Sequence, residues 1–249
     1  MPVQMSEDAV LGGRLILRQP LRGHRVGHDA ILLAAATGVK SDEHAVEFGA
    51  GVGAAGLGVA LREPTLKVTL IEIDSDLASL AQENAVRNGL ADRVRVITAD
   101  VEQLDAAMQN TADRVLMNPP FNDPRRHNLS PDPRRRRAHV ADAGLLQRWI
   151  ESATRVVRVG GVLTLIWRAD DLEGVLAALR PAFGDVGVLP IFPRAGAAPI
   201  RVLVRAVKGS GWTRREYAAL VLNDAAGQPT SEAEAVLRHA GTLALAELG

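Results

Sequence analysis

Short β-rich runs alternate with helical stretches along most of the chain, and this alternation constrains the fold more than any other feature. Strands are predicted at residues 44–48, 67–73, 93–98, 113–118 and 161–167, where Val, Ile, Leu and Phe are frequent. Strands that alternate with helices form a parallel sheet covered by helices on both faces. We therefore expect an α/β protein with a doubly wound sheet.

The helix predicted between the second and third strands carries signals at both of its ends. Asp74 or Ser75 can cap its start, and Gly89 can close its end. The apolar residues at helical spacing between them are Leu77, Leu80, Ala81 and Ala85. A second helix is predicted over residues 144–158, directly before the fifth strand.

The alternation of strands and helices ends after the fifth strand. Residues 187–194 and 200–209 are both strand-like, and the gap between them is too short for a crossover helix, so the pair is predicted to be antiparallel. The whole pattern indicates a Rossmann-like, mostly parallel, seven-stranded sheet with an antiparallel C-terminal strand and an N-terminal extension. A capping box at Ser231 and Glu234 starts a final helix, which either closes the fold or binds a partner.

Composition excludes several classes of function. The formal net charge is zero, so no field of the whole chain attracts nucleic acid or membrane. Cysteine is absent, which excludes disulfides, thiol catalysis and cysteine-bound metal. The first ten residues do not resemble a signal peptide, and no apolar run reaches the roughly 20 residues of a membrane helix. We expect a soluble, cytoplasmic protein.

Three glycines follow the first predicted strand. Gly49, Gly51 and Gly53 permit positive φ angles and allow a ligand to approach the backbone beneath a helix N-terminus. Gly51, Gly53 and Gly56 also satisfy the dinucleotide fingerprint, which is weak evidence when it stands alone. Glu47 argues against a dinucleotide, because an acid in the last residues of the strand repels a pyrophosphate and attracts a cation.

Acidic residues follow the next two strands. Glu72, near the end of the second strand, is suited to accept hydrogen bonds from the ribose hydroxyls of an adenosine-containing cofactor. Asp100, after the third strand, is placed to receive an adenine amino group. Each residue alone is more often a turn or cap residue. Their occurrence at successive strand ends behind a glycine turn favours a cofactor site.

The fourth strand ends in Asn118, Pro119, Pro120 and Phe121. The side-chain oxygen of Asn118 and the carbonyl oxygen of Pro119 can accept both hydrogens of an aromatic exocyclic amine, which frees the nitrogen lone pair for attack. The prolines restrict the backbone that holds these acceptors, and Phe121 offers a stacking face for a base. The alternative is a polyproline turn with a core phenylalanine. The position behind the glycine turn and the two acids favours amine chemistry.

These motifs resemble a known family. The glycine turn, Glu72 and Asn118–Phe121 resemble the S-adenosylmethionine-dependent methyltransferases of the amino-methylating type. Residues 17–37 resemble the N-terminal segment of the bacterial tRNA(Val) adenine N6-methyltransferases, although His24 and His28 stand where we expect an aromatic residue and an apolar or small residue. The resemblance implies methyl transfer from S-adenosylmethionine to the N6 amine of an adenine in tRNA.

The resemblance also implies roles for individual residues. Glu47, Gly49, Gly51 and Gly53 are expected around the methionine part of the cofactor, with Glu72 at its ribose, Asp100 at its adenine and Asp29 at its amino acid end. Asn118 and Pro119 are expected to hold the target amine. Residues 1–39 are expected to form an extension packing over the cofactor site, and residues 40–249 the catalytic domain. No metal site is expected.

A basic segment follows the predicted catalytic residues. Residues 122–139 contain six arginines against two aspartates, which leaves four net positive charges on a neutral protein. The arginines are Arg125, Arg126, Arg134, Arg135, Arg136 and Arg137. Arginine side chains beside a base pocket are suited to grip phosphates, so RNA contact is favoured over a solvated loop without a function.

Other functions stay open. The same chemistry on ribosomal RNA, a DNA base or a protein glutamine uses the same Asn-Pro-Pro-aromatic element. A non-catalytic RNA-binding protein does not need the complete set of site residues. An NAD-dependent oxidoreductase is supported by the ambiguous glycines alone. The sequence does not indicate an oligomeric state.

Overall fold

The computed structural model describes residues 4–21, 25–120 and 134–247, with residues 134–143 described by their backbone alone. The helices and strands are β1 (Met5–Val10), β2 (Leu15–Pro20), α1 (His28–Ala36), β3 (His44–Phe48), α2 (Ala54–Arg62), β4 (Lys67–Glu72), α3 (Ser75–Arg87), β5 (Val94–Thr98), β6 (Ala112–Met117), α4 (Arg134–Val156), β7 (Val157–Arg168), α5 (Leu172–Leu179), β8 (Phe183–Arg194), β9 (Arg201–Lys208), β10 (Arg214–Glu216), β11 (Leu220–Asn223) and α6 (Ser231–His239). None of these described helices has the length and apolar character needed to cross a membrane.

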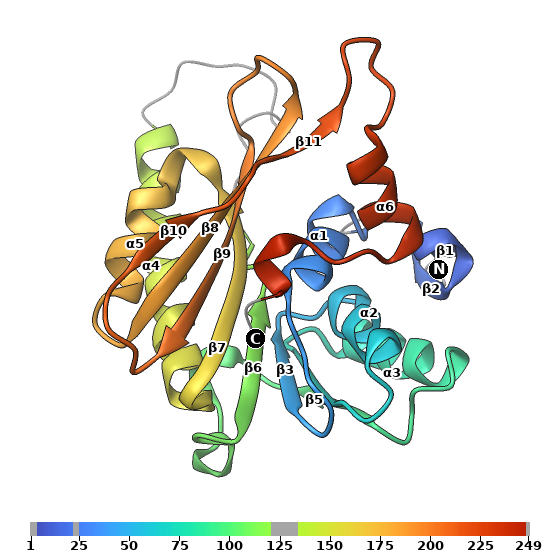
Figure 1. Ribbon diagram of the computed structural model, residues 1–249. Helices are drawn as coiled ribbons and strands as arrows, with labels where there is room; N and C mark the ends of the chain where they lie inside the picture. Colours follow the sequence, from blue (N-terminus) through green and yellow to red (C-terminus); the bar gives the residue numbers. More distant parts are fainter. Residues whose placement is uncertain (1–3, 22–24, 121–133, 248–249) are drawn as a thin grey trace.

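One large sheet divides the molecule into layers. Its strand order is β10-β8-β9-β7-β6-β3-β4-β5, with β11 also paired to β8. Helices α1, α2 and α3 cover one face, and α4 and α5 cover the other (Figure 1). Strand β3 pairs in parallel with both β4 and β6, so the chain order reverses there. Ligands of open α/β sheets bind at such a switch point, beyond the carboxyl ends of the strands.

The predicted sheet is confirmed. Strand β9 runs antiparallel to both β7 and β8, as the short gap before it indicated. The seven strands β3 to β9 form the expected mostly parallel sheet. Strands β10 and β11, which the sequence analysis did not foresee, extend this sheet by parallel pairing to β8. Strand β10 has only three residues and all are exposed, so it lacks the apolar alternation that signals a strand.

The helix caps were predicted with mixed success. Asp74 caps α3, because its side chain accepts hydrogen bonds from the amides of Asp76 and Leu77. Gly89 closes α3 with φ of +68°, as expected. The capping box of α6 was wrong, since Thr230 is the N-cap and accepts from the amide of Ala233. The Thr230 hydroxyl also donates to the Val221 carbonyl of β11 at 2.7 Å, and this tertiary bond fixes the cap one residue early.

The buried side chains form two clusters, one on each face of the sheet. Alternation along β3 sends Val46 and Phe48 to the face covered by α4, and Ala45 to the face covered by α1 and α2. Glu47 shares the face of Ala45, so this alternation directs its carboxylate towards α2. The carboxyl group is thereby buried beside the glycine turn.

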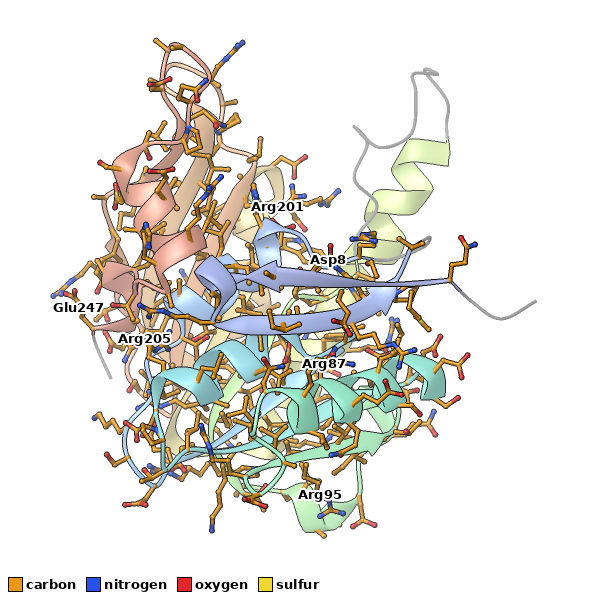
Figure 2. All side chains as sticks on the ribbon, turned by 90° about the vertical axis from the view of Figure 1, so that its right-hand side faces the viewer. Asp8, Arg87, Arg95, Arg201, Arg205 and Glu247 are labelled. Carbon is orange, nitrogen blue, oxygen red and sulfur yellow. The ribbon has the colours of Figure 1, made fainter. Side chains whose placement is uncertain are left out.

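The N-terminal hairpin of β1 and β2 lies across α2 and α3 (Figure 2). The side chain of Asn84 on α3 accepts from the Arg18 amide at 2.7 Å and donates to the Arg18 carbonyl at 3.1 Å, and Asn88 makes the same pair of bonds to Ile16. These amides satisfy an edge of β2 that is otherwise without a neighbouring strand. Asn84 also donates to the Val52 carbonyl at 3.0 Å, so it joins the hairpin to the glycine turn.

Candidate active site

A cavity of about 290 Å³ lies at the carboxyl ends of β3, β4 and β6, beside the start of α1. It is lined by Arg25, Val26, Gly27, Asp29, Ala30, Glu47, Gly49, Ala50, Gly51, Val52, Ala54, Glu72, Ile73, Leu77, Asn118, Pro120 and Trp149. The structure therefore brings together the glycine turn, two predicted acids, Asp29 and the start of the Asn-Pro-Pro segment.

Three other predicted site residues within the described ranges, Gly53, Asp100 and Pro119, do not line this cavity. Gly53 caps α2 behind the turn, and Pro119 is buried beside Asn118. Asp100 caps the short helix η2 (Val101–Gln103), where its side chain accepts from the Glu102 amide at 2.9 Å. Phe121, Arg125 and Arg126 lie outside the described residues. Arg134, Arg135, Arg136 and Arg137 form the first turn of α4, and their side chains are not described.

The three glycines of the turn meet different requirements. All have positive φ: +63° at Gly49, +56° at Gly51 and +88° at Gly53. A Cβ on Gly49 would lie 2.6 Å from the Trp149 ring, and one on Gly53 would lie 2.9 Å from Leu70. A Cβ on Gly51 would meet nothing within 4 Å. Gly49 and Gly53 therefore permit close packing, whereas Gly51 leaves open space at the cavity wall.

Glu72 holds the turn in place. One carboxylate oxygen accepts from the Gly51 amide at 2.7 Å, and the other accepts from the Asp74 amide at 2.9 Å. The side chain thus fixes both the glycine turn and the start of α3. A carboxylate oxygen can accept more than one hydrogen bond, so Glu72 keeps acceptor capacity towards the cavity.

Glu47 is buried at the cavity wall, where its Oε2 accepts from the Gly56 amide of α2 at 2.6 Å. Burial raises the pKa of Glu47 to about 8, the bond to Gly56 opposes this rise, and the nearby negative charge of Glu72 adds to it. Without a bound cation, Glu47 is therefore mostly protonated at neutral pH. The sequence argument assumed a charge at this position, and the missing factor was the desolvation of a fully covered carboxyl group.

Asp29 lies in the first turn of α1 and accepts a hydrogen bond from Nε of Arg201 at 3.0 Å. Arg201 is the first residue of β9. Because β9 runs antiparallel, its first residue reaches the same edge of the sheet as the last residues of the parallel strands. No local signal in the sequence indicates this pair, since the two residues are 172 positions apart.

Trp149 and Ile73 are among the cavity residues that were not predicted as site residues. Trp149 is 7% exposed and its ring packs edge-on against Phe48, with centroids 6.4 Å apart, yet it also lines the cavity. Ile73 is 67% exposed although it is a large apolar residue. Its position directly after Glu72 was an available signal. It offers the cavity an apolar surface against which a flat ring can pack.

Residues 25–190 match the protein family described as the methyltransferase small domain. This match spans more than half of the sequence and includes strands β3 to β7 and every residue that lines the cavity. The chain belongs to the methyltransferase small domain family. The family resemblance predicted from the glycine turn and Asn118–Phe121 is therefore confirmed.

Two curated relatives carry the name of a specific methyl-transfer reaction. The tRNA1(Val) (adenine(37)-N6)-methyltransferase of Porphyromonas gingivalis strain W83 is 31% identical over 158 residues, which cover 60% of this chain and 60% of the relative. The enzyme of the same name from Klebsiella pneumoniae strain 342 is 33% identical over 98 residues, covering 39% and 40% of the two chains. The chain thus spans less than two thirds of the length of these relatives.

Solved structures share the fold. A protein described as a predicted O-methyltransferase from Agrobacterium tumefaciens superimposes with a TM-score of 0.72 and 28% identity, covering 86% of this chain and 98% of the other. TrmN from Thermus thermophilus superimposes with a TM-score of 0.52 and 21% identity, covering 72% and 47%, which shows a common fold.

Proposed function

We propose that this chain transfers a methyl group from S-adenosylmethionine to the N6 amine of an adenine in tRNA. The observation that carries the proposal is the meeting of Asn118 with the Gly49–Gly51 turn and Glu72 around one cavity. The curated relatives named for this reaction on tRNA support the choice of substrate. Methylation of tRNA implies a cytoplasmic location.

The residues of the cavity fit the cofactor. Glu72 retains acceptor capacity for ribose hydroxyls, and the open side of Gly51 leaves room for a ligand against the backbone. Ile73 provides an apolar surface for the adenine, and Asp29 an acceptor for the ammonium group. When bound, S-adenosylmethionine supplies an electrophilic methyl group on a sulfonium. Asp100 remains a proposed adenine contact, although it does not line the cavity.

The chain's own contribution to the reaction is the positioning of the amine. Asn118 follows the last residue of β6, is half-buried and lines the cavity, while Pro119 fixes the backbone after it. The Asn118 side-chain oxygen and the Pro119 carbonyl oxygen accept the two N–H groups of the target amine. The nitrogen lone pair is then directed at the methyl group, and the amine proton is lost after transfer. Phe121 is proposed to stack on the base.

Residues 1–39 are proposed to form a cover over the cofactor site. Arg25, Gly27 and Asp29 line the cavity from this segment. The bonds of Asn84 to Arg18 and to Val52 tie the hairpin to the glycine turn. Residues 40–249 then form the catalytic domain that this extension covers.

The function is tested by methyl transfer from labelled S-adenosylmethionine to separate pools of unmodified tRNA, ribosomal RNA, DNA and protein. Label in tRNA that digests to N6-methyladenosine is the expected result. Label in another pool would retain the chemistry and replace the substrate. Cofactor binding without transfer to any pool would contradict the proposed activity and favour a non-catalytic RNA-binding protein.

Gly51→Ala is expected to weaken S-adenosylmethionine binding by about tenfold or more, because the added methyl group enters open space at the cavity wall. Calorimetric titration measures the change. Gly89→Ala is the matched control, since Gly89 also has positive φ, +68°, and a Cβ there also meets nothing within 4 Å. Both variants carry a similar backbone strain of about 1 kcal/mol, so equal cofactor affinities would remove Gly51 from the proposed site.

Replacing Arg134, Arg135, Arg136 and Arg137 by glutamate is expected to weaken tRNA binding at least about tenfold and to flatten its salt dependence, because fewer phosphates are neutralised. Arg134 starts α4, the helix that also carries Trp149 to the cavity wall. Filter binding across a salt series measures both effects. Reversal of Arg95, an exposed residue that lies at the opposite end of the sheet from Arg201 (Figure 2), is the control. If the quadruple variant binds tRNA as tightly as the wild-type protein, the arginines are part of a solvated segment that does not contact RNA.

A further inference from the structure

Two more cavities adjoin the active-site cavity at the start of α1. One has a volume of about 190 Å³ and the other about 800 Å³. Gly27 lines all three cavities, and His28 and Leu222 line both of the additional ones. The three cavities thus lie side by side along α1, and we call this row the groove; it extends from the active site to residues of β11, α6 and the N-terminal hairpin.

The walls of the groove combine apolar side chains with polar and charged ones. Ile31 and Leu222 lie on its walls, and the side chain of His28 is exposed between its two outer cavities. The charges along it are balanced, because Arg201 pairs with Asp29, and Arg238 and Glu234 both face the largest cavity from α6. A groove with apolar walls and balanced charges is suited to a planar base that carries polar edges, and not to a row of phosphates.

The chemistry of the substrate supplies an occupant, provided that the proposed function holds. A target adenosine in an RNA strand is covalently joined to a neighbouring nucleotide on each side. When the adenine enters the active-site cavity, its neighbouring nucleotides lie next to that cavity, and the groove begins there at Gly27. Helices α4 and α6 lie on opposite sides of α1 (Figure 1), so the basic start of α4 and the groove flank the site from two directions.

We propose that this groove binds the base of a nucleotide adjacent to the target adenosine, with the imidazole of His28 stacking on it. Bases extruded from RNA are commonly held by stacking on aromatic side chains, and histidine serves in this role. His28 is also one of the positions where the sequence departs from the related N-terminal segment. The departure therefore lies where the neighbouring base would be read.

The test compares His28→Ala with the wild-type protein on synthetic tRNAs that carry one abasic nucleotide directly before or directly after the methylated adenosine. Loss of the stacked base on the correct side is expected to lower kcat/KM of the wild-type protein about tenfold. His28→Ala should show a similar loss on intact tRNA and almost no further loss on that abasic tRNA. Its affinity for S-adenosylmethionine should be unchanged, and His239→Ala, an exposed histidine of α6 outside the groove, should behave as wild type.

Leu222→Trp fills the groove from β11 and gives a second, independent measurement. Like His28→Ala, the Leu222→Trp variant should have a lower kcat/KM on intact tRNA than the wild-type protein. The abasic nucleotide should cause almost no further loss in this variant. If His28→Ala lowers kcat/KM equally on intact and abasic tRNAs, or lowers it on neither, the proposal for the groove is overturned. The proposed function still stands in that case, provided that the wild-type protein methylates tRNA. Failure of the wild-type protein to methylate any RNA would instead contradict the proposed function. If the wild-type protein transfers label to the protein pool and Leu222→Trp abolishes this transfer, the groove binds a peptide, which would also overturn the proposal.

Discussion

Asn118→Ala is expected to lower methyl transfer to tRNA at least about 100-fold while leaving S-adenosylmethionine binding nearly unchanged. The alanine removes one of the two acceptors that orient the target amine, and loss of one preorganised hydrogen bond at a reacting centre commonly has an effect of this size. The glycine turn and Glu72, which are proposed to hold the cofactor, keep their contacts because neither bonds to the Asn118 side chain. Single-turnover transfer and calorimetric titration measure the two quantities separately.

Asn118→Asp provides the matched control for this experiment. It keeps an acceptor oxygen at the same position, so it should retain more transfer than the alanine variant. A fall in cofactor affinity as large as the fall in turnover would show that Asn118 supports the cavity and does not position the amine. Undiminished turnover in Asn118→Ala would remove the residue from the reaction.

The second large effect concerns the pH dependence of stability. The pKa of Glu47 is about 8 in the folded protein and 4.5 for an ordinary glutamate. Between these values the unfolded chain has released the proton and the folded chain retains it. The unfolded state therefore binds fewer protons, and the free energy of unfolding falls as pH rises, by up to about 1.4 kcal/mol per pH unit from this group.

Glu47→Gln is expected to remove this contribution, because the amide cannot ionise and its oxygen can still accept from the Gly56 amide. The free energy of unfolding of the variant, relative to the original protein, should rise by roughly 1 kcal/mol per pH unit between pH 5.5 and 7.5. Urea unfolding without cofactor at three pH values measures the difference. Glu232→Gln, at an exposed glutamate of α6, should give a constant difference. A constant difference for Glu47→Gln as well would show that the carboxyl ionises normally.

The same protonation has a consequence for the proposed cofactor. A cation that enters the cavity favours the ionised form of Glu47, so binding should release a proton near neutral pH. The sequence predicted a carboxylate at Glu47 beside the methionine part of the cofactor. Binding of the cationic cofactor is therefore expected to ionise Glu47, and the resulting carboxylate then stabilises the bound cation. This coupling between cofactor binding and the ionisation of Glu47 arises because the Glu47 side chain is buried.

The sequence by itself determined the architecture, because the signals involved are local. Apolar alternation gave the strands, and their alternation with helices gave the parallel sheet with an antiparallel pair at its C-terminal side. Asp74 and Gly89 marked the ends of α3 through bonds that span only a few residues. The position of the Asn118 segment and the glycine turn at strand ends placed both at one edge, since parallel strands end at the same edge.

Only the tertiary structure decided what those residues contact, because the deciding partners are distant in sequence. The protonation of Glu47 depends on its burial beneath α2, and the pairing of Asp29 with Arg201 depends on the reversed direction of β9. The cap of α6 moved to Thr230 because β11 supplies a bond. The groove beside His28 exists because α1, β11 and α6 meet there, which no periodicity in the chain can indicate. Local spacing thus fixes where a strand ends, whereas burial and long-range pairing fix the charge and the neighbours of the residues at that end.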